Sequence, residues 1–371
     1  MFSRRRHRLV EGGLGVLAQL TQGIIGLGLL LVGHQASFAV ATSALAVSAF
    51  AVAMAVGRPL QGRALDAWPP RAVLAWCGVG HVAGYVLIAA SAHAHWPAAF
   101  VACSLLAGVT LPPIATQMRA EWPDRSAAGP GVFAVIAMLQ TVSVLVAPVL
   151  FAAVNSVASA SVAMLTVAVV SGVCTVLFAL VIPRSESAAS VRRRVALRRY
   201  LAPLVVTLLF GAVDGTVQVY APAVAIAAHH PGVAGPLVIT ATVGTLLGAL
   251  YAMSPAGHRL GTRTMLLAAA VVQAVGAVVL LLPLPLVVAA AGLLTVGAGA
   301  TPAIAALGVM VSERAGGTAE GFGWQSTALG LGVAAGSAVA GALAAAAAHL
   351  SAVPALVCAL GCSLWILMLW P

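Results

Sequence analysis

The sequence predicts an all-α integral membrane protein with twelve transmembrane helices in two pseudo-symmetric halves of six helices each. Three observations lead to this fold class. The chain is 62% hydrophobic with a mean hydropathy of +1.08, only 7% of its residues are charged, and long apolar runs recur from end to end. Soluble domains are roughly 45–50% apolar, and so few charges cannot cover a soluble surface of this size. A lipid bilayer is therefore the expected environment.

A helix crosses the hydrocarbon core of a bilayer with about 20 apolar residues. Twelve runs of this kind follow one another along the chain: Leu9–Val32, Ser37–Gly57, Ala72–Ala92, Pro97–Met118, Pro130–Val154, Ser159–Pro183, Tyr200–Ile226, Val233–Met253, Arg263–Leu282, Pro285–Val311, Gly321–Ala348 and Leu350–Trp370. The first run is too long for the core of a signal peptide, so we expect a retained helix. The short connections leave no room for a sizeable domain outside the membrane.

The arginines predict the orientation of these helices. All eighteen basic residues are arginines, and with both termini in the cytoplasm every one falls in an inner segment. This agrees with the positive-inside rule. The net charge of +10 is then a topology signal, and we expect no nucleic-acid partner.

The sequence contains no pattern typical of a metal site or an enzyme. The five cysteines lie inside apolar runs without CxxC spacing, so we expect packed, reduced thiols. Paired carboxylates, His-rich clusters and Ser-His-Asp sets are missing at membrane depth. We expect neither metal nor catalysis.

Two stretches half a chain apart are weakly similar, as in transporters built from duplicated halves. "RAVLAWCGVGHVAGYVL" from Arg71 aligns with "RTMLLAAAVVQAVGAVV" from Arg263 at an offset of 192, and "LPPIA" from Leu111 aligns with "TPAIA" from Thr301 at an offset of 190. We therefore predict an N-terminal half (1–183), a cytoplasmic linker (184–199) and a C-terminal half (200–371).

Charged residues are concentrated in "GRPLQGRALDAWPPR", at the cytoplasmic end of the second helix. With twelve helices in two halves, this loop resembles the signature of the major facilitator superfamily. Gly62, Asp66 and Arg71 match that signature, whereas Ala67 and Pro69 depart from it. "APVLFAA" from Ala147 is loosely similar to the Gly-Pro motif of the family's exporters, and "TAEGFGWQST" from Thr318 is similar to the loop before helix 11 in bacterial efflux permeases.

The resemblance implies a latch on the cytoplasmic side. An aspartate at the end of helix 2 can face the N-terminus of helix 11, near Gly321–Trp324, where unpaired N–H groups carry partial positive charge. Such a contact would stabilise the outward-facing state. The expected gating motif comprises Gly62, Arg63, Asp66, Arg71 and Arg119. The second copy of the loop, at His258, lacks the acid. The alternative is that these residues merely mark a cytoplasmic loop.

Asp214 is the one acid well inside a predicted span. An ionised acid there costs a few kcal/mol, so it should face a cavity or be protonated. It shares a helix face with Gly211, Gly215, Gln218 and Pro222, and in the family this seventh helix lines the cavity. Asp214 is thus a candidate for proton coupling, or alternatively a structural aspartate bonded to a neighbouring helix.

Intramembrane amides are candidates for the substrate cavity, although each can equally join helices through hydrogen bonds. They are Gln19, Gln22, Gln117, Gln140 and Gln218.

Together these features predict a secondary active transporter of the bacterial inner membrane, exporting a small amphiphilic or drug-like molecule in exchange for protons. It would work as a monomer in the lipid bilayer, without a cofactor other than the proton gradient. The alternatives are a facilitator or importer on the same fold, or a non-transporting membrane receptor.

Overall fold

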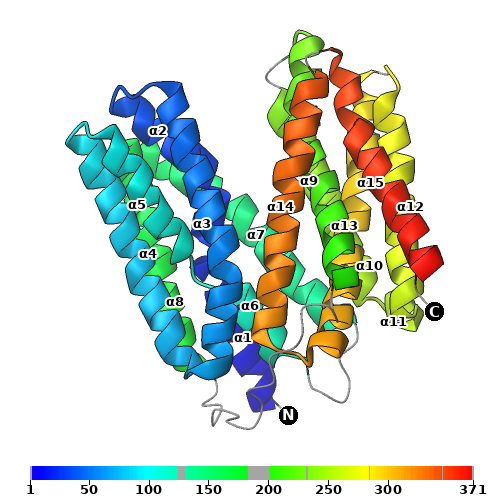
Figure 1. Ribbon diagram of the computed structural model, residues 1–371, viewed down its shortest axis with the longest axis horizontal. Coiled ribbons are helices and arrows are strands. Elements are labelled where there is room, and N and C mark those ends of the chain that lie inside the picture. The colour runs from blue at the N-terminus through cyan, green and yellow to red at the C-terminus, as the bar shows by residue number, and fades with distance from the viewer. Residues whose placement is uncertain are drawn as a thin grey trace. The chain divides into compact units, whose positions relative to one another are not determined.

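A computed structural model describes residues 2–123, 130–182, 201–230, 233–283, 285–344 and 346–369. These residues form helices, turns and short connections, without a strand (Figure 1). In these ranges eleven helices are long and apolar enough to cross a membrane, and the remaining predicted span is discontinuous. The described helices divide into two compact units. The fold is therefore the predicted all-α membrane architecture.

Unit 1 comprises the described residues of Met1–Met118, Leu139–Arg194 and Thr318–Gly323. Its core gathers large side chains that include Phe50, Tyr85, Phe100 and Phe151. Helix α3 packs on α5, α4 packs on α5 and α8, and α1 packs on α8. Its complete elements are α1 (Phe2–Ala18), η1 (Leu20–Gly23), α2 (Ile25–Gln35), α3 (Val40–Ala67), α4 (Pro70–His93), α5 (Pro97–Val109) and α8 (Ala160–Val181). Two further helices belong to it in part: α6 (Ile114–Glu121) as far as Met118, and α7 (Pro130–Asn155) from Leu139 onward.

The first predicted span is not one continuous helix, because the 3₁₀ turn η1 separates α1 from α2. Two contacts hold this turn within unit 1. Nδ1 of His81 donates to Ala107 O at 2.8 Å, so Nε2 is left to accept from the hydroxyl of Thr21 at 3.0 Å. At Gly23 a Cβ would lie 2.8 Å from Val144 O on α7. The interruption therefore depends on contacts with residues far along the chain.

The fourth predicted span is also interrupted, between α5 and α6. Pro112 and Pro113 follow each other there, and a proline lacks the N–H that would continue the helical hydrogen bonds. The matching stretch of the second half has one proline, Pro302, and stays inside the continuous helix α13 (Leu286–Ala315). The second proline accounts for the difference between the two halves.

Unit 2 comprises the described residues of Arg119–Met138, Val195–Gly317 and Trp324–Pro371. Its core includes Val213, Tyr220, Leu280 and Leu293, and the Tyr220 hydroxyl donates to Leu280 O at 3.0 Å. Besides α13 and the first part of α7, its elements are α9 (Leu201–Ala227), α10 (Ala234–Met253), α11 (Pro255–Arg259), α12 (Thr262–Leu281), η4 (Ala348–Ala352) and α15 (Val353–Leu369). Helix α14 (Ala319–Ala344) belongs to unit 2 from Trp324 onward.

Two pairs of glycines bring α9 and α14 into backbone contact. Cβ atoms at Gly211 and Gly215 would collide with carbonyl groups of α14, and Cβ atoms at Gly332 and Gly336 would collide with carbonyl groups of α9. Small residues allow helices in membranes to approach this closely. The contact fixes which face of α9 is turned away from α14.

Equivalent arginines make equivalent contacts in the two units. Arg71, at the start of α4, donates from Nη2 to Ile182 O, just beyond α8, at 2.6 Å. Arg263, at the start of α12, donates from Nη2 to Leu367 O, near the end of α15, at 3.4 Å. These are the two arginines that the weak internal repeat aligns. In each half, an arginine thus bonds the helix of the third predicted span to the end of the sixth in the same way.

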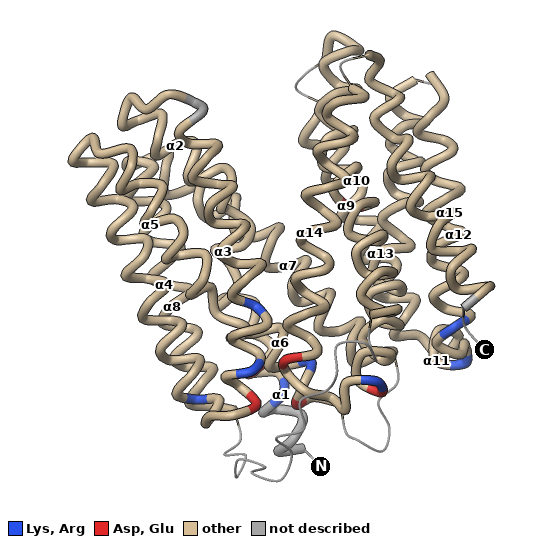
Figure 2. The backbone as a smooth tube through the Cα atoms, in the orientation of Figure 1, with Lys and Arg blue, Asp and Glu red and all other residues tan. Residues whose placement is uncertain are grey.

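The compact units exchange two short segments relative to the halves predicted from the sequence. The described residues of 119–138 group with unit 2, and residues 318–323 group with unit 1. The predicted linker, residues 184–199, lies outside the described residues. Most described charged residues gather at one end of each unit (Figure 2).

Candidate functional site

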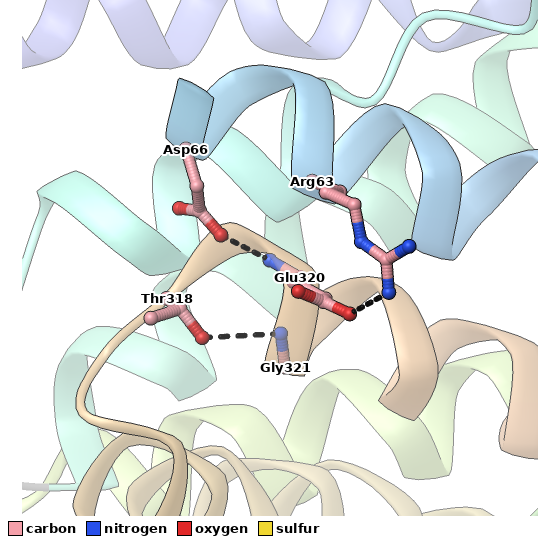
Figure 3. A network of polar contacts seen from close by, with 5 residues as sticks. All are labelled: Arg63, Asp66, Thr318, Glu320 and Gly321. Carbon is pink, nitrogen blue, oxygen red and sulfur yellow. Dashed lines mark hydrogen bonds and ion pairs between the residues drawn. The ribbon is translucent and has the colours of Figure 1, made fainter. Parts of the chain in front are cut away.

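Asp66 lies near the end of α3 and accepts two hydrogen bonds from the first turn of α14. The backbone N–H of Ala319 donates to Oδ1 at 2.9 Å, and the backbone N–H of Glu320 donates to Oδ2 at 2.8 Å. Thr318 contributes a third bond, since its hydroxyl oxygen accepts from the N–H of Gly321 at 3.3 Å (Figure 3). The first three N–H groups of α14 are therefore satisfied, two of them by a carboxylate placed at the positive end of the helix.

Arg63 and two glycines complete this contact within unit 1. Nη2 of Arg63 lies 2.6 Å from Oε1 of Glu320 (Figure 3). A Cβ at Gly62 would collide with Ala319 O, and a Cβ at Gly323 would lie 2.5 Å from Arg58 O. Only glycine permits such an approach. The requirement at Gly323 was not recognised from the sequence, although "GFG" at the start of a helix is a usable signal.

Arg71, a member of the expected gating motif, has a partner outside the contact between Asp66 and α14. Arg71 donates to Ile182 O, and its Nε is enclosed without a partner in the described part of the chain. It thus joins α4 to the end of α8, and its grouping with Asp66 stays a prediction. Arg119 is buried on α6.

The second copy of the loop places a histidine at the corresponding position in unit 2. His258 donates from Nδ1 to Ser254 O at 2.8 Å. A Cβ at Gly131, in the first turn of α7, would lie 2.6 Å from its Nε2. The imidazole of His258 therefore lies beside the first turn of α7.

Arg58 and Gln61 are functional candidates outside the expected gating motif. Both side chains are buried, with 8% of each exposed. Nη1 of Arg58 donates to Leu111 O at 3.3 Å and Pro112 O at 3.2 Å, and Nε2 of Gln61 donates to Val109 O at 2.8 Å and Leu111 O at 3.0 Å. Their N–H groups thus bond the backbone carbonyl groups that the break between α5 and α6 leaves without a helical donor. The adjacent prolines were the available signal.

Asp214 and Gln218 form a polar pair in the middle of α9. Nε2 of Gln218 donates to Oδ2 of Asp214 at 3.2 Å. Between Val206 and Ala225 every other side chain of α9 is buried or half-buried, and only these two are exposed. A surface facing lipid would expose apolar side chains. The exposed strip of α9 is therefore suited to contact with water.

The other amide candidates belong to unit 1. Gln19 is buried, donates to Gly15 O at 2.8 Å and leaves Oε1 without a partner in the described structure. Gln22 lies in η1 and is half-buried, Gln117 is buried on α6, and Gln140 is half-buried on α7. Of the five amide candidates, Gln218 is the one that the described structure bonds to the candidate acid.

Among the described residues, no three His, Cys, Asp or Glu side chains gather as a metal site would require. The five cysteines are free thiols.

Apolar spanning helices, two units with matching contacts and a charged loop bonded to a helix N-terminus define a multi-pass membrane transporter fold. The sequence profile of the Major Facilitator Superfamily matches residues 13–316. The chain belongs to this superfamily.

Solved structures share the fold at low sequence identity. A bacterial homologue of the iron transporter ferroportin, in an outward-facing state, is 13% identical with a TM-score of 0.78 over 97% of this chain and 98% of its own. The E. coli transporter FucP, in the outward conformation, is 12% identical with a TM-score of 0.74 over 96% and 97%. The human organic anion transporter MFSD10 is 19% identical with a TM-score of 0.70 over 98% of both chains. A comparison with curated protein sequences gives no match.

Proposed function

We propose that the protein is a proton-coupled exporter of a small amphiphilic molecule in the bacterial inner membrane, working by alternating access. The observation that carries this proposal is the exposure of Asp214 and Gln218 on an otherwise enclosed stretch of α9. An acid in the middle of a membrane helix is a functional candidate by default. Its exposure beside an amide supports a water-accessible carboxyl that can gain and lose a proton.

In this mechanism the carboxyl group of Asp214 carries the proton, and Gln218 holds that carboxyl group in position. The amide of Gln218 donates to Oδ2, which stabilises the ionised carboxylate and leaves Oδ1 free to receive a proton. Protonation removes a charge that is costly within the membrane. The ionised carboxylate of Asp214 is therefore favoured in contact with water, and the protonated carboxyl is favoured within the membrane. Such a difference between the two states is required to couple proton movement to transport.

The contact of Asp66 with the first turn of α14 is proposed as the latch that stabilises the outward-facing state. Helix α14 begins in unit 1 and continues in unit 2. Losing the bonds of Ala319 and Glu320 to Asp66 would free the start of this helix from α3. The latch would thus act on an element that belongs to both units.

Asp214→Asn tests the coupling. Asparagine keeps the size and the hydrogen bond with Gln218 but cannot titrate. In energised inverted membrane vesicles, addition of amphiphilic compounds should dissipate the proton gradient with the wild type and not with Asp214→Asn, while gradient-independent exchange of the same compounds survives. The readout is recovery of the fluorescence of a pH-sensitive dye.

Gln218→Met is the matched control for this experiment, since it removes the bond to Asp214 and keeps the titratable group. It should retain proton-coupled flux at a reduced rate. Wild-type gradient-driven flux in Asp214→Asn would identify the residue as structural and refute proton coupling at this site.

An importer is the second candidate, because the E. coli fucose:proton symporter FucP has the same fold. The direction of compound movement in sealed vesicles of known orientation separates the two. We further propose that the protein functions as a monomer with both termini in the cytoplasm and uses no cofactor.

A further inference from the structure

Arg58 is a buried cation inside a membrane helix. It lies eight residues before Asp66 on α3, which at about 1.5 Å per residue places it roughly 12 Å from the cytoplasmic end of that helix. Only 8% of the residue is exposed. A charged side chain enclosed in protein is costly and is a candidate functional residue.

Arg58 has no carboxylate partner in the described part of the chain. Its hydrogen bonds all leave from Nη1, and all reach neutral oxygens: Gln61 Oε1 at 3.5 Å, Leu111 O at 3.3 Å and Pro112 O at 3.2 Å. The acids near this end of α3 are engaged elsewhere, because Asp66 binds the first turn of α14 and Glu320 binds Arg63. The described residues therefore do not neutralise the positive charge of Arg58.

Repair of the helix break does not by itself require a charge. Gln61, which is neutral, already donates to Val109 O and Leu111 O. A neutral donor at position 58 could serve Pro112 O in the same way. The cost of burying a guanidinium thus exceeds what this structural task needs.

The free edge of the guanidinium has a defined shape. Nε and Nη2 make no hydrogen bond to the described residues. These two nitrogens present parallel N–H groups, the arrangement that binds a carboxylate with both oxygens. Nη1 is held on the α5–α6 break, which fixes the direction of this edge.

We propose that Arg58 binds the carboxylate of an organic anion, so that the amphiphilic substrate carries a negative group. This proposal rests on the proposed transport function and names its substrate class. The bound carboxylate would supply the charge that the described part of the chain does not place beside Arg58.

Binding of matched probes tests the proposal without any proton gradient, so a failure of Asp214 coupling would not affect the result. The purified full chain in phosphatidylcholine nanodiscs is equilibrated with carboxylate and amide pairs on three scaffolds: naphthyl, indolyl and decyl. For at least one pair the wild type should bind the carboxylate about tenfold or more tightly than the amide, as expected for a charged hydrogen-bonded pair.

Three variants separate charge from folding. Arg58→Gln should lose the preference for the carboxylate, and Arg58→Lys should retain part of it. Gln61→Met disturbs the same helix break and keeps the charge, so it should retain the full preference. Equal loss in Arg58→Gln and Gln61→Met would identify Arg58 as a purely structural residue and overturn the proposal.

The wild type itself provides a second decisive outcome. Absence of a carboxylate preference on all three scaffolds, including absence of binding, would overturn the proposal. Adding phosphatidylglycerol to the nanodiscs distinguishes a soluble anion from a lipid headgroup. If the lipid abolishes binding of the probes, Arg58 is a headgroup site and the substrate assignment is wrong.

Discussion

At the scale of single residues, the function of Asp66 depends on its geometry and its exposure. The carboxylate bonds to two adjacent N–H groups of α14, but the residue is exposed. Charge–helix contacts at exposed sites are worth about 0.3–1 kcal/mol, which corresponds to roughly a two- to fivefold shift between two states. The latch can therefore bias an equilibrium without locking it.

Asp66→Asn should weaken the latch by this amount. Asparagine keeps one acceptor oxygen but loses the charge at the helix end. Gln325 is buried on α14, two residues beyond Gly323, so a cysteine there reports release of the helix. In a cysteine-free background its labelling rate should rise about two- to fivefold in Asp66→Asn.

Arg71→Ala is the matched control for the latch, since the hydrogen bond that the described residues give Arg71 reaches Ile182 O. It should leave the labelling of the reporter at position 325 unchanged. Identical labelling of wild type and Asp66→Asn, with identical flux, would mean that the charged stretch has no latch function.

At the scale of helices, close approach decides which substitutions the fold tolerates. Gly215 lies where a Cβ would collide with Val333 O, whereas a Cβ at Gly330, on the facing helix α14, would have no described atom within 4 Å. Asp214 lies on α9 between Gly211 and Gly215, the two glycines that pack against α14. The packing of α9 on α14 therefore bears on the position of the candidate coupling residue.

Gly215→Ala should destabilise the protein by about 1–3 kcal/mol, because the methyl group forces α9 and α14 apart. Gly330→Ala should be neutral or stabilise by about 0.5–1 kcal/mol, since alanine favours helix where there is space. Unfolding temperatures of the purified variants in one detergent provide the comparison. Equal unfolding temperatures would contradict the close α9–α14 contact.

At the scale of the whole molecule, the distribution of arginines predicts one cytoplasmic and one outer surface. Cysteines replacing His93 and His230 should react with an impermeant thiol reagent from outside intact cells. Cysteines replacing Arg259 and Glu313 should react only after the membrane is opened. All four positions are exposed, so accessibility depends on the side of the membrane. Reaction of both sets from outside would refute the topology.

Sequence alone determined the membrane class, the positions of the spans and the internal repeat. These features are local or periodic: apolar runs set the spans, and the aligned Arg71 and Arg263 make matching contacts in their units. The placement of Asp66 against α14 was anticipated through the family resemblance. These conclusions needed no knowledge of which side chains meet.

Tertiary structure decided how the irregular backbone is satisfied. The break after α5 is bonded by Arg58 and Gln61, about 50 residues earlier, and η1 is held by His81, 60 residues later. The carbonyl partners of Arg71 and Arg58 could not be predicted from the sequence for the same reason. A buried donor or acceptor takes the partner that packing brings within reach, and separation along the chain does not reveal that partner.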